Sequence, residues 1–304
     1  MKTGLQRGRT SSPARSADIP VRYGDLSRKM RTGMSALRAR SYRESGWSRV
    51  DLAVLIGVVA LAVLWLGYSR LGERGRIARC ARNLAVLGQA IDTYANDHQD
   101  GLPAAAINLE SVKTSWDAEL FPYLKPRLAG SGGEYQKRQI LLAAQPSFFC
   151  PSDPVLRGGH PRSYAMAARD MRCGWPPSAD DKTGVGLFWA KSSIPLLGKE
   201  VVESSLKDAE LLPKLKRSVL PAPASTLLLT ELMERKNTMA STLSVLLWGV
   251  NEQEAVFKQA PRMHSGRFNY LMADGHVEWL TKLQTGGGGG IDSPSGIWTI
   301  KAGD

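Results

Sequence analysis

The stretch that decides the fold is residues 52–69, which read LAVLIGVVALAVLWLGYS and carry no charged side chain over 18 residues. At about 1.5 Å of rise per residue, a helix of this length reaches roughly 27 Å, close to the thickness of the hydrocarbon core of a bilayer. A buried helix of a soluble protein normally has a polar face, and this stretch has none. It therefore predicts one membrane-spanning helix.

The basic residues of the chain are concentrated before this helix. Residues 1–46 hold 11 Lys or Arg against 3 Asp or Glu, whereas the remainder holds 29 against 25. The net charge of +12 thus belongs mostly to this leader, which we expect to be disordered, and we expect no nucleic-acid partner. The positive-inside rule favours a cytoplasmic leader, so we expect a protein of the cytoplasmic membrane with its C-terminal domain on the extracytoplasmic side. A secretory signal peptide would be shorter and would end in small residues, so we expect a single-pass anchor.

Residues 77–98 continue as an amphipathic helix, which Asp100 and Gly101 end. Together with the membrane stretch it is expected to form one rod of about 50 residues within residues 47–100. Gly72 and Gly75 would allow this rod to bend. The apolar stripe of the second half is expected to contain Ile77, Ala81, Leu84, Leu87, Gly88, Ile91, Tyr94 and Ala95.

Residues 101–285 mix helix and strand patterns and predict an α+β head domain with an antiparallel sheet. The expected elements are a short helix at 116–124, a strand end running into a turn at 148–154, an exposed loop at 172–183, a buried strand at 226–230 and a further strand at 243–250. Residues 268–280 alternate with period two around Asp274-Gly275, which predicts a β-hairpin with a two-residue turn. Residues 286–304 are expected to be a Gly-rich linker and tail, with a small final strand at 297–300.

Four blocks of sequence, in this order, resemble one known family. They are GWSRVD at 46–51, RIARCARNLAVLGQAIDTYANDHQDGLP at 76–103, FFCPSDP at 148–154 followed by RSYAM at 162–166, and His264 ten positions before Asp274-Gly275. The blocks resemble prepilin-type, pseudopilin-like proteins that carry an N-terminal cleavage and methylation segment and a prepilin-processing-associated His-x9-Asp-Gly motif.

This resemblance implies a type IV pilin-like fold and a structural subunit, not an enzyme, of a type II secretion or type IV pilus-like system. It implies that a prepilin peptidase cuts after Gly46 and that the new amine on Trp47 is methylated. It also implies that Asp51 forms the assembly contact with the amine of another pilin-like subunit, a pair that an apolar bilayer would favour. Arg49 stands where the family has an apolar residue. If Arg49 paired with Asp51 within one chain, that pair would compete with the assembly contact between subunits.

The motif residues His264, Asp274 and Gly275 leave two interpretations open. His264 and Asp274 would bind a metal or perform acid–base chemistry, with His276 nearby. Alternatively, Asp274-Gly275 supplies a turn that needs positive φ, and His264 makes hydrogen bonds near the hairpin; we favour this second interpretation. No cofactor is expected; for a bound metal the first candidate is Ca²⁺, because pseudopilins include calcium-bound members.

Three cysteines are too few for a disulfide scaffold, and without a CxxC pair a structural zinc site is not expected. Cys80 and Cys150 would form a disulfide worth roughly 4 kcal/mol in an oxidising periplasm. The alternatives are buried free thiols, or Cys173 as the partner of Cys150. Glu231 and Glu234 follow the 226–230 strand and are expected to face solvent rather than to act as paired catalytic carboxylates.

Two other functions stay open. An anchored periplasmic enzyme would need a cleft where His264, His276 and Asp274 converge. A membrane-tethered binding module that never polymerises is favoured by Arg49 within the processing segment.

Overall fold

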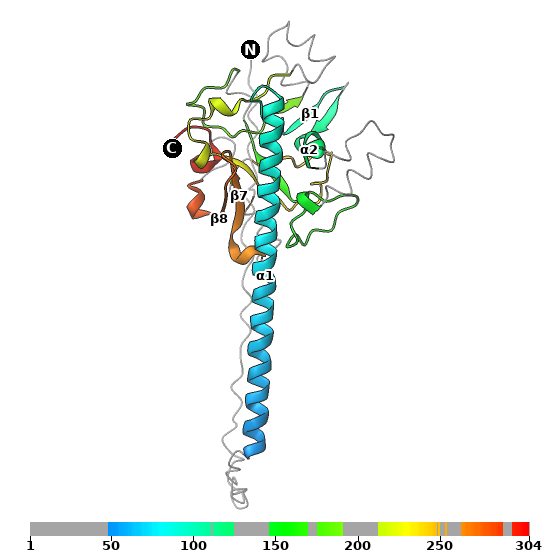
Figure 1. Cartoon of the computed structure of the whole chain (residues 1–304), viewed down its shortest axis with the longest axis vertical. Coiled ribbons are helices and arrows are strands. Elements are labelled where there is room, and N and C mark those ends of the chain that lie inside the picture. Colours follow the sequence, from blue (N-terminus) through cyan, green and yellow to red (C-terminus); the bar gives the residue numbers. More distant parts are fainter. Residues whose placement is uncertain are drawn as a thin grey trace, which may run out of the picture. The chain divides into compact units, whose positions relative to one another are not determined.

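The computed structural model describes residues 48–110, 112–124, 146–169, 175–190, 212–247, 249, 253, 263–287 and 294–303, with the side chains of 68–71 excepted (Figure 1). The expected leader 1–46, the residues Gly46, Trp47 and Cys173, and most of the Gly286–Gly290 linker lie outside this description. Over these described residues the chain is α+β, with one long helix and two sheets in which antiparallel pairs predominate.

The long helix α1 runs from Arg49 to Asp97 and includes both stretches that the sequence predicts as helix. The chain divides into two compact units, Met1–Val59 and Ala60–Asp304, and α1 begins in the first of them. Every described residue of the first unit is exposed, and in the second unit α1 stays exposed through Gly67. Among the described residues, α1 is the one helix long and apolar enough to cross a membrane.

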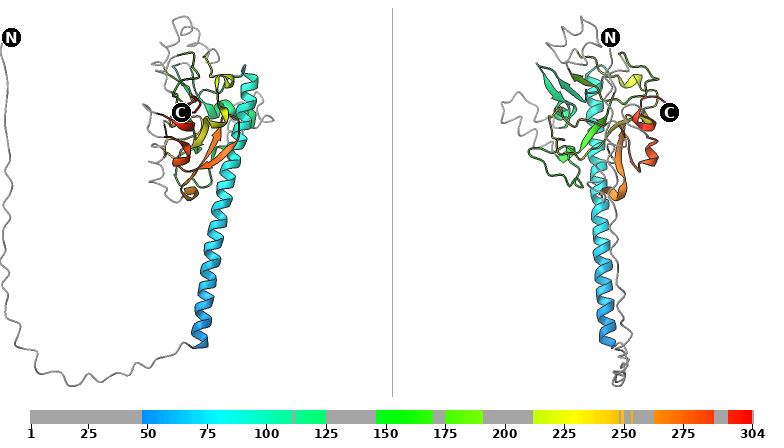
Figure 2. Two further views of the ribbon diagram at one scale, coloured as in Figure 1. Left: turned by 90° about the vertical axis from the view of Figure 1, so that its left-hand side faces the viewer. Right: turned by 180° about the vertical axis from the view of Figure 1, so that it is seen from behind.

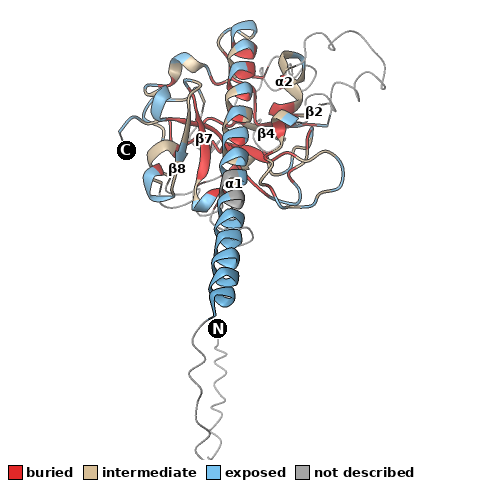
Figure 3. Cartoon of the chain, turned by 60° about the horizontal axis from the view of Figure 1, so that its bottom comes forward, coloured by how far each residue is buried: buried red, intermediate tan, exposed pale blue. Residues whose placement is uncertain are grey.

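The C-terminal half of α1 buries one stripe against the head. Of the stripe predicted from the sequence, the residues from Leu84 onward are buried, whereas Ile77 and Ala81 are half-buried. Figure 3 shows the buried residues gathered in the strands and in the part of α1 beside them. At Gly88 the helix approaches β7 (Phe268–Met272) so closely that an added Cβ would lie 3.0 Å from a methyl carbon of Leu271.

The larger sheet has five strands in the order β6-β3-β5-β7-β8. Its strands are β3 (Tyr164–Ala167), β5 (Leu227–Glu231), β6 (Leu246–Leu247), β7 and β8 (Val277–Leu280). All neighbours pair antiparallel except β3 and β6, which are parallel. Both views of Figure 2 show strands of the head beside the C-terminal half of α1.

The smaller sheet has the order β2-β1-β4, formed by β1 (Ala106–Asn108), β2 (Lys113–Ser115) and β4 (Phe188–Ala190). The sequence predicted an antiparallel sheet. The β1–β4 pair, however, is parallel, so each of the two sheets contains one parallel pair. Helix α2, Trp116–Leu124, follows β2 and has the predicted bounds. Its apolar residues Trp116 and Leu120 are fully buried.

A buried polar network fixes the start of α2. Arg162 and Asp117 form a fully buried ion pair. Arg162 also donates to the side-chain oxygen of Asn237 at 2.7 Å and to the carbonyl of Leu243 at 3.0 Å. Because both charges have partners, the pair avoids the large penalty of an isolated buried charge.

The hairpin of β7 and β8 confirms the period-two prediction, with Phe268 opposite Leu280 and Leu271 opposite Val277. Its loop is longer than predicted. Met272 donates its backbone N–H to the carbonyl of His276, so the loop inside this closing pair has three residues, 273–275, where two were predicted. Gly275 has φ +92°, the conformation that a three-residue hairpin loop requires at its last position.

Three smaller predictions are wrong. Residues 297–300 do not form a strand: Gly296–Trp298 is a 3₁₀ helix, because the buried Trp298 and Ile300 pack into the core. For 148–154 a strand end was expected, but Phe148 ends a short helix at 146–148 and residues 149–150 are not in a strand; the expected turn is present at 151–152. Of the predicted strand 243–250, only β6 forms in the described part, because pairing with β3 extends over two residues. The described part of the expected loop, 175–183, has no helix or strand.

Candidate functional site

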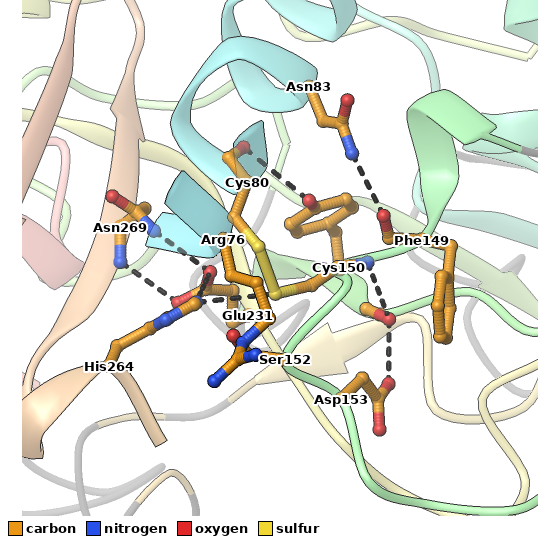
Figure 4. The surroundings of a disulfide bond; sticks show 12 residues. Arg76, Cys80, Asn83, Phe149, Cys150, Ser152, Asp153, Glu231, His264 and Asn269 are labelled. Atoms are coloured by element: carbon orange, nitrogen blue, oxygen red, sulfur yellow. Dashed lines mark hydrogen bonds and ion pairs between the residues drawn. A yellow bond between two sulfur atoms is a disulfide. The ribbon is translucent and has the colours of Figure 1, made fainter. Parts of the chain in front are cut away.

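Four side chains with metal-binding or redox chemistry meet inside the head. Cys80 comes from α1, Cys150 from the segment after residues 146–148, Glu231 from the end of β5, and His264 from the turn Met263–Gly266 before β7. One ligand atom of each lies within 4.8 Å of the others, and all four residues are buried. Figure 4 shows these side chains pointing toward one another from separate elements.

Cys80 and Cys150 are joined by a disulfide across 70 residues of sequence. It links α1 to the head at a point where both residues are fully buried. Two further contacts reinforce this link: Asn83 donates to the carbonyl of Phe149 at 2.8 Å, and the Tyr164 hydroxyl donates to the carbonyl of Cys80 at 3.5 Å. Of the alternatives that the sequence left open for the cysteines, the structure thus contains the Cys80–Cys150 disulfide.

His264 is fully buried and hydrogen-bonded on both ring nitrogens. Nε2 lies 2.9 Å from Oε1 of Glu231 and 3.2 Å from Sγ of Cys150, and Nδ1 lies 3.3 Å from Oε1 of Glu73. Burial alone would lower the pKa of His264, but the carboxylates of Glu231 and Glu73 outweigh it and raise the pKa above its ordinary value. His264 thus makes hydrogen bonds before the hairpin, as the second interpretation expected, and the same contacts leave metal binding by this residue untested.

The backbone at His264 is strained. His264 has φ +46° and the next residue, Ser265, has φ +56°, both in the left-handed region that non-glycine residues rarely adopt. The backbone N–H of His264 donates to Oε1 of Glu73 at 3.0 Å, which helps to hold this conformation. Such strain is maintained only where surrounding contacts fix it, and it is often found at functional sites.

Glu231 is fully buried, so the prediction that it faces solvent is wrong. The β5–β7 pairing brings it beside Asn269, which donates its backbone N–H to Oε2 at 2.9 Å and its side-chain amide to Oε1 at 3.0 Å. Glu234, the other carboxylate expected in solvent, is exposed. Sequence reasoning missed Glu231 and Glu73 as partners of His264, because their proximity depends on strand register and helix packing.

Asp274 lies at the far end of β7 from His264. Its carboxylate accepts from Nδ1 of His276 at 2.6 Å in the hairpin loop. His264 precedes β7 and Asp274 follows it, and β7 extends roughly 13 Å. These two residues of the His-x9-Asp-Gly pattern therefore do not meet. The cleft that an anchored enzyme would build from His264, His276 and Asp274 does not form from these residues.

At the start of α1, Ser48 and Asp51 cap each other. The backbone N–H of Ser48 donates to Oδ2 of Asp51 at 2.9 Å, and the N–H of Asp51 donates to Oγ of Ser48 at 3.1 Å. This is the reciprocal arrangement of a capping box. Arg49 and Asp51 are two positions apart, a spacing that does not bring side chains onto one helix face, and no ion pair joins them among the described residues.

The donors around His264 do not suit Ca²⁺, which prefers oxygen ligands. They are two sulfurs, one imidazole nitrogen and one carboxylate. Comparison of the chain with models of known families, with curated proteins and with solved structures found no match.

Proposed function

We propose that this chain is a pseudopilin-like, membrane-anchored structural subunit that assembles through α1. The observation that carries the proposal is the pattern of burial along this single helix. Large apolar side chains from Val50 to Leu66 are 44–70% exposed, whereas the stripe from Leu84 to Ala95 is buried under the head. An exposed apolar surface of this kind is unfavourable in water, so it needs lipid or neighbouring helices.

The start of α1 supports assembly as well as anchoring. Asp51 is the fifth residue counted from Trp47, directly before the apolar stretch. If Asp51 enters the hydrocarbon region together with the apolar stretch, its carboxylate favours a cationic partner, because an unpaired charge inside the bilayer is costly. After cleavage at Gly46, the amine of a neighbouring subunit's Trp47 is the partner that we propose.

Cross-linking in native membranes tests this proposal, with two variants that separate the roles of Asp51. Asp51→Asn removes the charge, whereas Ser48→Ala removes the capping hydroxyl and keeps the charge. We expect the wild type and Ser48→Ala to give a ladder of subunit multiples, and Asp51→Asn to lose it. A ladder that Asp51→Asn leaves intact contradicts assembly through this contact, and equal loss in both variants assigns Asp51 to helix capping alone.

The tethered, non-polymerising module remains the second candidate, because Arg49 puts a positive charge near the proposed assembly amine. If Arg49 weakens processing, Arg49→Leu increases the fraction of chains that begin at Trp47. An unchanged fraction in membrane extracts contradicts the idea that the chain is a pilin weakened by Arg49.

A further inference from the structure

The four-residue cluster has the composition of a zinc site. Zn²⁺ in proteins is bound by Cys, His and carboxylate side chains, most often four in tetrahedral arrangement. The cluster provides two cysteines, Nε2 of His264 and Oε1 of Glu231, all from buried residues. Nothing else described in the head brings four such groups together.

The distances are close to those that a tetrahedral site requires. With Zn–S bonds of about 2.3 Å and Zn–N or Zn–O bonds of about 2.0–2.2 Å, neighbouring ligand atoms lie roughly 3.3–3.8 Å apart. Nε2 of His264 now lies 3.2 Å from Sγ of Cys150 and 2.9 Å from Oε1 of Glu231. All ligand atoms of the cluster lie within 4.8 Å of one another. The two sulfurs, now covalently joined, must separate to reach these distances, and breaking their bond releases them to do so.

Two residues outside the cluster already orient the ligands. Nδ1 of His264 faces the carboxylate of Glu73 at 3.3 Å, the arrangement that fixes a zinc-binding histidine with Nε2 free for the metal. Asn269 holds both oxygens of Glu231. A disulfide alone requires neither a buried carboxylate nor an imidazole beside it, so the disulfide does not account for this polar environment.

We propose that Cys80, Cys150, Glu231 and His264 bind one Zn²⁺ when the Cys80–Cys150 disulfide is reduced. A dithiol reductant supplies two electrons and two protons; its own sulfurs become a disulfide, and the two cysteines become thiols. Zn²⁺ then displaces one proton from each thiol and the proton that Nε2 of His264 shares with Glu231. A protein disulfide of an oxidising partner reverses the reaction, forms the Cys80–Cys150 bond and releases the metal. This site does not depend on the proposed role in assembly.

The zinc site would keep α1 attached to the head in both redox states. In the oxidised chain the S–S bond makes this connection, and in the reduced chain the metal makes it through Cys80. A newly made chain would therefore hold the position of α1 before oxidation, since metal binding contributes directly to folding free energy.

Cobalt titration of the full chain in detergent micelles tests the site. The chain is reduced with a phosphine and freed of metal, and Co²⁺ is added as the spectroscopic probe. We expect one equivalent to bind with a thiolate-to-cobalt charge-transfer band and the intense visible bands of a tetrahedral site, and Zn²⁺ to displace it. The oxidised chain should show neither band.

Variants identify the ligands. Glu231→Gln and His264→Gln should each weaken binding at least tenfold, and Glu73→Gln should weaken it about 10–100-fold without changing the thiolate band. Cys173→Ser is the matched control and should leave the titration unchanged. The comparison of reduced and oxidised wild type remains valid even if a variant misfolds. The proposal is overturned if the reduced chain does not bind one equivalent of Co²⁺, or if the oxidised chain binds it equally. Loss of the bands in Cys173→Ser overturns it as well.

Discussion

Removal of the disulfide should destabilise the head strongly. The bond joins residues 70 positions apart, and the chain-entropy model assigns a loop of that length about 4 kcal/mol. The double variant Cys80→Ala/Cys150→Ala should therefore lose about 4 kcal/mol of unfolding free energy and, for a head of this size, roughly 10 °C in Tm. Alanine is used because both sulfurs are fully buried, so a hydroxyl would add a desolvation cost.

Urea unfolding of the full chain in detergent measures this change. Trp116, Trp189 and Trp298 are buried, so their fluorescence reports exposure of the core. Cys173→Ala is the control and should unfold as the wild type does. Wild-type protein reduced in the presence of a metal chelator should resemble the double variant. A loss below about 1 kcal/mol, or an equal loss in Cys173→Ala, would refute the reasoning that this crosslink stabilises the head.

Three further predictions concern packing and charge. Asp117→Ala should lower the unfolding free energy, measured in urea, by about 3–5 kcal/mol, because Arg162 is left as an uncompensated buried charge. Adding Arg162→Leu should recover part of the loss, and a double variant without recovery would contradict this explanation. Gly88→Val should lower the unfolding free energy by about 1–3 kcal/mol, because even a Cβ there would lie 3.0 Å from a leucine methyl of β7. Gly75→Ala is the control: Gly75 has open space around it, so this change should be neutral or stabilising. The pKa of His264 is raised in the folded state, so protonation of this side chain stabilises the fold. The contribution is complete below about pH 6.5 and disappears as the pH rises through the folded-state pKa. His264→Gln should therefore flatten that part of the stability–pH curve, and an unchanged slope would contradict a positive charge on His264 in the fold.

Local periodicity predicted the helices and the hairpin. The three-and-four spacing from Leu84 to Ala95 marks the face of α1 that the head covers, and residues 116–124 form α2 with the predicted bounds. The strand predicted at 297–300 failed because Ile and Trp favour strands only where a neighbouring strand is available. There the apolar side chains pack into the core from a 3₁₀ turn instead.

The candidate site was harder to predict, since its residues are separated by long stretches of chain. Cys80, Cys150, Glu231 and His264 come from four elements, and no short spacing pattern connects them. Glu231 was expected in solvent because it ends an apolar strand. Its burial follows from the β5–β7 register, which brings it against Asn269. Only the assembled sheet determines that neighbour.

The most direct test of the proposed function is mass spectrometry of the protein's N-terminus, taken from its native membranes. The proposal predicts a chain that begins at Trp47 with a methylated amine. An intact Met1 would contradict processing and leave a simple membrane anchor, and a chain that begins beyond Ser69 would contradict anchoring through α1.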